Sequence, residues 1–342
     1  MSGCPFCAID VHTHVVPGHF PPYAGRTGLA SWPSMQEAQP CHRHVMIDGK
    51  VYRTVSDRAW DGKLRIVDMD ELSLRAQVLS PMPELLSYWM DVADATQLLR
   101  FINSEIAAMV AAAPGRFFGL GAVPLQDIDA AISELDHAVN VLGLSGIEIA
   151  GNVNGVPIGD PQFAPFWAAA ADLGAAVFIH PLRPTGMDRL VGPKPLQQLL
   201  AFPSESGLAL ASLITGGVIE RHPGLRIASS HGGGTLSALL PRLQQGWNSM
   251  PAVRESMPSA PMELARKLYY DSLVYDTRTL AGLIDIFGDT QIMVGSDYPF
   301  QIRDKNPVGS IEKLTLAPDV LAKVLWQNAL RWLNVPAENF LA

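Results

Sequence analysis

The sequence predicts an α/β fold, specifically a (β/α)8 barrel of the TIM type with a long cap insertion after its first strand. Short apolar runs alternate with longer segments of helical periodicity, a pattern typical of a parallel sheet covered by helices. Eight such units occur in 342 residues, a length that one closed barrel accommodates. We therefore expect a single domain over residues 1–342, with the cap at about residues 18–60.

The units follow one another along the chain with little interruption after the cap. The expected strands are Ala8–Val15, Ala76–Pro81, Phe117–Pro124, Gly146–Ala150, Ala176–Pro181, Arg226–Gly232, Leu268–Tyr275 and Gln291–Pro299. The expected helices are one around Asp61–Leu74, then Glu84–Ala112, Asp127–Leu142, Asp160–Leu173, Pro195–Arg221, Thr235–Trp247, Thr277–Phe287 and Pro318–Leu333. Asp127 and the Asp160-Pro161 pair are typical of helix N-termini.

Residues 18–60 interrupt this rhythm, because they are rich in Pro, Gly, His and Arg and show no periodicity. A structureless loop of that length is uncommon in a compact domain unless it has a function. It follows the C-terminal end of the first strand, where barrel enzymes place their active sites. We interpret it as a cap over a site.

The bulk composition excludes several classes of protein. Apolar residues make up 48% of the chain and charged residues 17%, as in a well-buried globular protein. A formal net charge of −8 argues against nucleic acid or an anionic membrane as the main partner. The start lacks a signal-peptide pattern, and the apolar run Gly207–Ile219 is too short to span a bilayer. The cysteines Cys4, Cys7 and Cys41 do not suggest a disulfide framework, so we expect a cytoplasmic protein.

The strongest functional signal is a group of histidines and one aspartate at the ends of predicted strands. His12 and His14 are two apart on the first strand and point to the same side of it. His180, His231 and Asp297 end the fifth, sixth and eighth strands. Any one of these is equally well a hydrogen-bonded polar residue at a strand end. All five on one rim predict a site.

The chemistry of these residues suggests how they divide the work. A catalytic metal takes three or four protein ligands and keeps a position open for water or substrate. We expect His12, His14, His180 and Asp297 to be the ligands. His231 precedes three glycines that would let substrate approach the backbone, and we expect it to be the general acid/base. Asp297 can also exchange a proton as a catalytic group, because a metal lowers the pKa of bound water towards about 7.

This set of strand-end residues resembles the amidohydrolase superfamily. The motifs His231-Gly-Gly-Gly and Gly295-Ser-Asp-Tyr-Pro-Phe300 resemble its branch of decarboxylases related to 2-amino-3-carboxymuconate-6-semialdehyde decarboxylase, as does Val123-Pro-Leu-Gln-Asp127. The resemblance implies a zinc-dependent C–C lyase, with Mn²⁺ as the alternative metal and no organic cofactor. It also implies a small unsaturated or aromatic carboxylate as substrate and a homodimer.

The same resemblance implies three substrate-binding residues. Arg53, seven residues before Trp60-Asp61, matches a cap arginine that binds the substrate carboxylate. Arg242 matches an arginine that reaches into the neighbouring subunit's site, and Phe300 matches an aromatic residue lining the pocket. A guanidinium group suits a carboxylate in bidentate geometry. Surface ion pairing for the arginines and plain packing for Phe300 remain the alternatives.

Two features distinguish this chain from its relatives. The fourth strand, Gly146–Ala150, has no lysine of the kind that bridges two metals in binuclear members, so we expect one metal. After His180 the branch continues with an aromatic and an acidic residue, whereas this chain has Leu182-Arg183-Pro184 and then Lys194. We hypothesise that Arg183 or Lys194 meets an additional anionic group, on a substrate other than aminocarboxymuconate semialdehyde.

The residues leave three functions open. Decarboxylation is the first, and the second is metal-dependent hydrolysis of a lactone, an amide or a C–C bond in a ring-cleavage product. The third is a non-catalytic binding protein, which a chain without bound metal would favour. We assign no role to the Cys4–Cys7 pair or to the cluster from Cys41 to His44.

Overall fold

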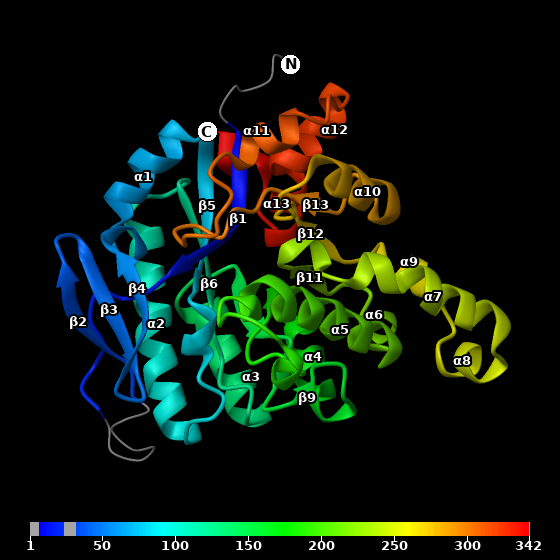
Figure 1. Ribbon diagram of the computed structural model, residues 1–342, viewed down its shortest axis with the longest axis horizontal. Coiled ribbons are helices and arrows are strands. Elements are labelled where there is room, and N and C mark those ends of the chain that lie inside the picture. Colours follow the sequence, from blue (N-terminus) through cyan, green and yellow to red (C-terminus); the bar gives the residue numbers. More distant parts are fainter. Residues whose placement is uncertain (1–6, 24–31, 342) are drawn as a thin grey trace.

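A computed structural model describes residues 7–23 and 32–341, and it confirms the α/β barrel (Figure 1). Eight parallel strands follow one another in chain order around a single sheet. They are β1 (Ala8–Val15), β5 (Leu74–Pro81), β6 (Phe117–Gly121), β7 (Gly146–Ala150), β10 (Ala176–His180), β11 (Arg226–Ser229), β12 (Tyr269–Asp271) and β13 (Ile292–Met293). The barrel is thus built as the alternation of apolar runs predicts.

The chain segment after β13 closes the barrel against β1. The Val11 N–H donates to the Val294 carbonyl at 2.8 Å, and the His14 N–H donates to the Tyr298 carbonyl at 2.7 Å. The expected last strand, Gln291–Pro299, is regular over two residues only. Beyond Met293 the chain keeps only isolated bridges to β1, at Val294 and Tyr298, and the backbone at Asp297 has a left-handed φ of 67°.

Helices surround the sheet and alternate with its strands. They are α1 (Gly62–Glu71), α2 (Val92–Ala112), α3 (Ile128–Asp136), α4 (Ala164–Asp172), α5 (Phe202–Thr215), α6 (Val218–Arg221), α7 (Leu236–Ser249), α8 (Pro251–Ser256), α9 (Pro261–Ala265), α10 (Thr277–Phe287), α11 (Pro307–Glu312), α12 (Pro318–Ala322), α13 (Asn328–Leu333) and α14 (Ala337–Leu341). Asp127 caps α3 by accepting from the Ala130 N–H at 2.9 Å. In the described part of the chain, no helix combines the length and the apolarity needed to cross a membrane.

Two of the expected long helices are divided. Glu84–Ala112 consists of a 3-10 turn, Pro83–Leu86, and then α2, because Ser87 between them has a φ of 57°. Pro195–Arg221 is interrupted between α5 and α6, where Gly217 has a φ of 72°. In both places a left-handed residue ends the helical hydrogen-bond ladder.

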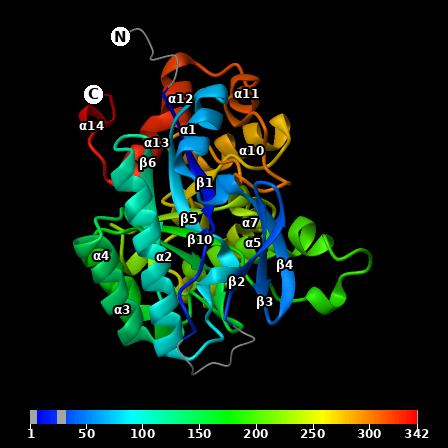
Figure 2. The same ribbon diagram turned by 90° about the vertical axis from the view of Figure 1, so that its left-hand side faces the viewer.

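The cap contains a three-stranded antiparallel sheet of β2 (Ser34–Gln39), β3 (His42–Ile47) and β4 (Lys50–Ser56), which lies on the flank of the barrel (Figure 2). The expectation of irregular structure is therefore wrong for residues 34–56. The physical reason is that β2 and β4 are largely exposed and β3 is mostly half-buried. They lack the apolar alternation by which a half-buried strand is recognised.

The opposite end of the barrel is sealed. Trp332 of α13 is fully buried and packs against Phe178 of β10, with ring centroids 6.0 Å apart. Phe178 in turn contacts the His12 ring, at a centroid distance of 5.2 Å. An apolar floor therefore lies directly beneath the strand-end histidines, and access to them comes from the side of the cap.

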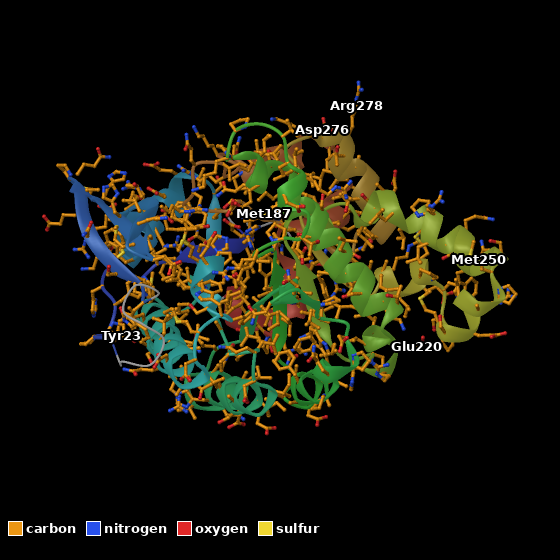
Figure 3. The ribbon with its side chains drawn as sticks, turned by 60° about the horizontal axis from the view of Figure 1, so that its bottom comes forward. Tyr23, Met187, Glu220, Met250, Asp276 and Arg278 are labelled. Atoms are coloured by element: carbon orange, nitrogen blue, oxygen red, sulfur yellow. The ribbon has the colours of Figure 1, made fainter. Side chains whose placement is uncertain are left out.

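Helices α7 and α8 form an arm that projects from the barrel (Figure 1). Met250 joins the two helices at the far end of the arm and is exposed (Figure 3). Leu239 of α7 is exposed as well.

Candidate metal centre

Four of the predicted residues come together at the C-terminal ends of the strands. His12 and His14 extend from β1, His180 ends β10, and Asp297 follows β13; all four are buried. One ligand atom of each lies within 4.8 Å of those of the others. His14 Nε2 is 3.1 Å from His12 Nε2 and 3.1 Å from Asp297 Oδ1.

The tautomers of the three histidines suit a metal. The Nδ1 atom of His12 lies 2.6 Å from Asp271 Oδ2. The Nδ1 atoms of His14 and His180 lie 3.1 Å and 2.9 Å from the carbonyl oxygens of Pro81 and Pro181. A proton on each Nδ1 satisfies these acceptors and leaves each Nε2 lone pair free for a metal. Three neutral imidazoles and one carboxylate form a donor set that fits a single divalent cation.

Asp271, at the end of β12, is a buried residue that hydrogen-bonds to the site, a link that the sequence analysis did not assign. Besides His12, its carboxylate accepts the Gly232 N–H at 2.7 Å. Without a bound metal, burial lowers the pKa of His12, but the hydrogen bond and charge of Asp271 outweigh it and raise that pKa to about 9. A cation at Nε2 would take the place of this proton. Asp271 therefore holds in place both His12, a candidate metal ligand, and the loop that carries His231. The sequence signal that could have indicated this role is that Asp271 ends a strand, as the other predicted site residues do.

His231 lies beside the four-residue group without belonging to it. Its ring centroid is 5.2 Å from that of His180 and 5.4 Å from that of His12. Burial and the neighbouring His12 lower the pKa of His231 to about 4, so the ring is neutral at pH 7 and can accept a proton. Its backbone φ is 56°, a conformation uncommon outside glycine that is often found at functional sites.

The three glycines after His231 have a packing role that the sequence analysis did not expect. Their φ values are 60°, 75° and 56° for Gly232, Gly233 and Gly234. A Cβ on Gly234 would lie 1.9 Å from the Pro203 carbonyl oxygen. Gly234 alone of the three lines the cavity above the site. The glycines thus chiefly permit a left-handed turn tightly packed under α5.

A cavity of about 340 Å³ opens above this centre. His180, His231 and Asp297 line it, together with Arg53 of β4 and Phe300. The Phe300 ring stacks on His14 at a centroid distance of 5.1 Å, and the Arg53 guanidinium lies 4.0 Å from the centre of the Phe300 ring. The apolar part of the lining comprises Leu199, Phe202, Leu273, Val274 and Ile302. The cavity therefore combines one cation, an aromatic face and an apolar wall next to the ligand group.

Residues 9–335 match the amidohydrolase family. The chain is 36% identical to 2-amino-3-carboxymuconate-6-semialdehyde decarboxylase of Dictyostelium discoideum, over 97% of this chain and 93% of that one. The chain belongs to the amidohydrolase family. Gamma-resorcylate decarboxylase of Rhodococcus jostii is 28% identical, over 70% of this chain and 77% of its own.

Solved structures of decarboxylases resemble this amidohydrolase along most of its length. The 5-carboxyvanillate decarboxylase of Sphingomonas paucimobilis superposes with a TM-score of 0.74 at 27% identity, over 82% of this chain and 85% of that one. A dihydroxybenzoic acid decarboxylase of Polaromonas superposes with a TM-score of 0.75 at 25% identity, over 84% and 90% of the two chains. Its crystals hold manganese and the inhibitor 2-nitroresorcinol.

The other cations that the sequence analysis singled out do not line the cavity. Arg183 stacks on the ring of Trp89, with its guanidinium carbon 3.5 Å from the ring centre, and it does not line the cavity. Lys194 lines an outer groove that shares Arg53 and Phe300 with the cavity. Arg242 is exposed on α7. Among the described residues, Arg53 is the arginine that lines the cavity, whereas the buried Arg65 donates to the backbone carbonyl of His14.

The cysteines lie outside this centre. Cys4 falls outside the described residues, whereas Cys7 is buried at the start of β1 and is disulfide-bonded. Cys41 is exposed and free. His44 lies 2.9 Å from the Thr54 hydroxyl within the cap sheet. Over residues 7–23 and 32–341, the group of four around His12 is the one arrangement suited to a metal.

Replacing Asp271 with asparagine is expected to weaken metal binding about 10- to 100-fold, the usual effect of losing a partner that orients a ligand. The carboxylate of Asp271 has two acceptor oxygens, one for His12 Nδ1 and one for the Gly232 N–H, whereas an asparagine amide has one acceptor oxygen. Competition with a chelator measures the affinity. Asp285→Asn, on the exposed face of α10, is the matched control. Equal affinities for the two variants would rule out this role for Asp271.

Proposed function

We propose that this protein is a metal-dependent, non-oxidative decarboxylase of a small unsaturated or aromatic carboxylic acid. The observation that carries the proposal is the buried group of three histidines and Asp297, with neutral His231 beside it in one small cavity. Relatives named as decarboxylases of 6-methylsalicylic acid and gamma-resorcylate support it. We propose one bound metal, zinc first and manganese as the alternative.

His12, His14, His180 and Asp297 would hold the metal, whose positive charge would stabilise negative charge developing on the substrate. Arg53 binds the substrate carboxylate in this proposal, because its guanidinium group already faces the cavity. Phe300 stacks against a planar substrate, held in place by His14 on one side and Arg53 on the other. These contacts fix the substrate over the centre before any bond breaks.

His231 would carry the proton that the reaction needs. Decarboxylation breaks the bond between the carboxylate group and the substrate carbon that bears it. The electron pair of this bond stays on the substrate carbon, and a proton takes the place of the CO₂ that leaves. A neutral imidazole can take up a proton from the substrate or solvent and return it to this carbon. The lowered pKa of His231 makes it a strong proton donor once it is protonated.

Incubation of the metal-loaded protein with a panel of hydroxybenzoates, aminobenzoates and muconate-type acids tests this function. We expect CO₂ release and a product with one carboxylate fewer. A new carboxylate without CO₂ would select hydrolysis of a lactone, amide or C–C bond instead. A protein that binds no metal and converts no acid would be a non-catalytic binding protein.

We also propose that the protein is a homodimer in which Arg242 completes the partner's site. Arg242 lies on α7, the inner helix of the projecting arm, and is exposed. Leu239 and Met250 on the same arm are exposed apolar side chains, which an interface between two arms would cover. A second arginine would add a bidentate partner for the substrate carboxylate.

Mixing two inactive variants tests the contribution of Arg242. Arg242→Ala and His231→Asn should each have little activity alone. In a mixed dimer, one site combines His231 of one chain with Arg242 of the other, so an equal mixture should recover about a quarter of the wild-type rate. The measurement is CO₂ release after the variants are allowed to exchange subunits. An inactive mixture whose exchange is verified would place Arg242 outside the partner's site.

A further inference from the structure

Glu84 is a buried acidic residue next to the candidate centre that the proposed mechanism does not use. It lies in the 3-10 turn Pro83–Leu86, which follows β5 at the catalytic end of the barrel. The residue is 6% exposed and lines the same cavity as Arg53, His231 and Asp297. A buried carboxylate in a cavity meant for an acidic substrate requires a reason, because like charges repel each other there.

The two carboxylate oxygens of Glu84 have different surroundings. Oε1 accepts a hydrogen bond from the Tyr52 hydroxyl and lies 3.9 Å from Arg53 Nη2. Oε2 is buried and has no hydrogen-bond partner among the residues that the structure describes. Leaving a charged oxygen unpaired in the interior is costly. A hydrogen-bond donor on a bound molecule would remove that cost.

An irregularity in the cap sheet brings two neighbouring side chains to Glu84. Val45 pairs with Arg53 and Met46 pairs with Val51, so Tyr52 is an extra residue on β4. Consecutive residues of a regular strand point to opposite faces, whereas a bulge redirects a side chain. The bulge thus allows Tyr52 and Arg53 to reach the same carboxylate. It fixes Oε1 and leaves Oε2 as the open acceptor.

We infer that Glu84 determines substrate specificity by accepting a hydrogen bond from a hydroxyl or amino group of the substrate. This group lies at the Arg53 end of the cavity and is distinct from any group held by the metal. The inference rests on the proposed function for the identity of the carboxylate substrate. It narrows the substrate to an acid that carries such a donor, and it excludes a second carboxylate at that position, because Glu84 would repel it.

Ligand binding tests this inference without relying on turnover. The probes are pairs of 2-hydroxybenzoates. The two members of a pair differ at one further ring position, which carries a hydroxyl group in one and a methyl group in the other. Each probe is titrated against the metal-loaded protein by calorimetry. We expect the hydroxyl form to bind about 10- to 100-fold more tightly at one ring position, as for a hydrogen bond to a charged acceptor. No preference at any position would overturn the inference, even if the protein decarboxylates one of the probes.

Two variants assign the preference to Glu84. Glu84→Leu should reduce it to less than about threefold, because no acceptor remains. Glu84→Gln is the second variant, for use if Glu84→Leu does not fold. Glutamine has nearly the same shape as glutamate, so this variant should keep the fold. With its carbonyl held by Tyr52, its NH₂ group would face the substrate and donate to a hydroxyl or a methoxy oxygen alike, so these two probes should bind within about threefold of each other. A folded Glu84→Leu that keeps the preference for hydroxyl over methyl, or a folded Glu84→Gln that still binds the hydroxyl probe much more tightly than the methoxy probe, would overturn the inference.

Glu134→Gln is the matched control. Glu134 is 2% exposed, as buried as Glu84, but its oxygens accept from Arg100 Nε at 3.0 Å and 2.8 Å. It does not line the cavity. This control should keep the full hydroxyl preference, and thermal unfolding of each variant verifies that it is folded. Loss of the preference in the control would assign it to general destabilisation and overturn the role of Glu84.

Discussion

Replacing His231 with asparagine is expected to lower kcat about 10²- to 10⁴-fold, the usual contribution of a positioned acid or base. Asparagine is the suitable replacement because the backbone φ of 56° disfavours most other side chains. KM should change little, since Arg53 and Phe300 still hold the substrate. Metal content should not change, because His231 is outside the ligand group.

Initial rates of CO₂ release give kcat and KM, and elemental analysis of the same preparations gives the metal content. His222→Ala replaces a histidine that lies outside the cavity and should keep wild-type rates. A His231→Asn variant with a rate within threefold of wild type would contradict the assignment. Loss of the metal in that variant would instead make His231 a ligand.

Replacing Asp297 with asparagine is expected to lower kcat/KM by about 10³-fold, because several kcal/mol of transition-state stabilisation depend on the metal. The amide keeps the size and the left-handed backbone but lacks the charge that balances a cation. Chelation of the wild-type metal should have the same effect, and added Zn²⁺ or Mn²⁺ should reverse it for the wild type.

Thermal unfolding provides an independent measure for this prediction. A cation that binds the folded chain raises Tm, so chelation should lower Tm in the wild type and much less in Asp297→Asn. The Asp285→Asn control should respond like the wild type. Full activity in the chelated wild type would contradict a metal-dependent reaction.

How far the fold could be predicted depends on where each element lies. β1 and β7 have the predicted bounds because they are buried along their whole length and carry β-branched apolar residues at alternate positions, such as Ile9 and Val11 in β1 and Ile147 and Ile149 in β7. The cap strands were missed because β2 and β4 are largely exposed and β3 is mostly half-buried, so that no apolar alternation marks them. The divided helices were missed because single left-handed residues, such as Ser87 and Gly217, end hydrogen-bond ladders without interrupting the apolar period.

In the site too, the residues on barrel strands could be predicted and those outside the strands could not. The ligand group could be proposed from residue order, because the carboxyl ends of parallel barrel strands meet on one rim. Site residues at the carboxyl ends of different strands therefore lie close to one another. Glu84 and the bulge at Tyr52 could not be proposed, because their contact joins a turn after β5 to a cap strand whose register the sequence does not reveal.

The sequence by itself therefore determined the barrel and the set of histidines and aspartate at its rim, through periodicity and position along the strands. The tertiary structure decided which of the outlying charges face the centre. It brought Arg53 and Glu84 to the cavity, placed Arg183 on Trp89, and left Arg242 on the surface. The physical reason is that hydrogen bonds between the parallel strands hold their carboxyl ends on one rim, whereas the position of a loop or a cap depends on the side chains that it packs against.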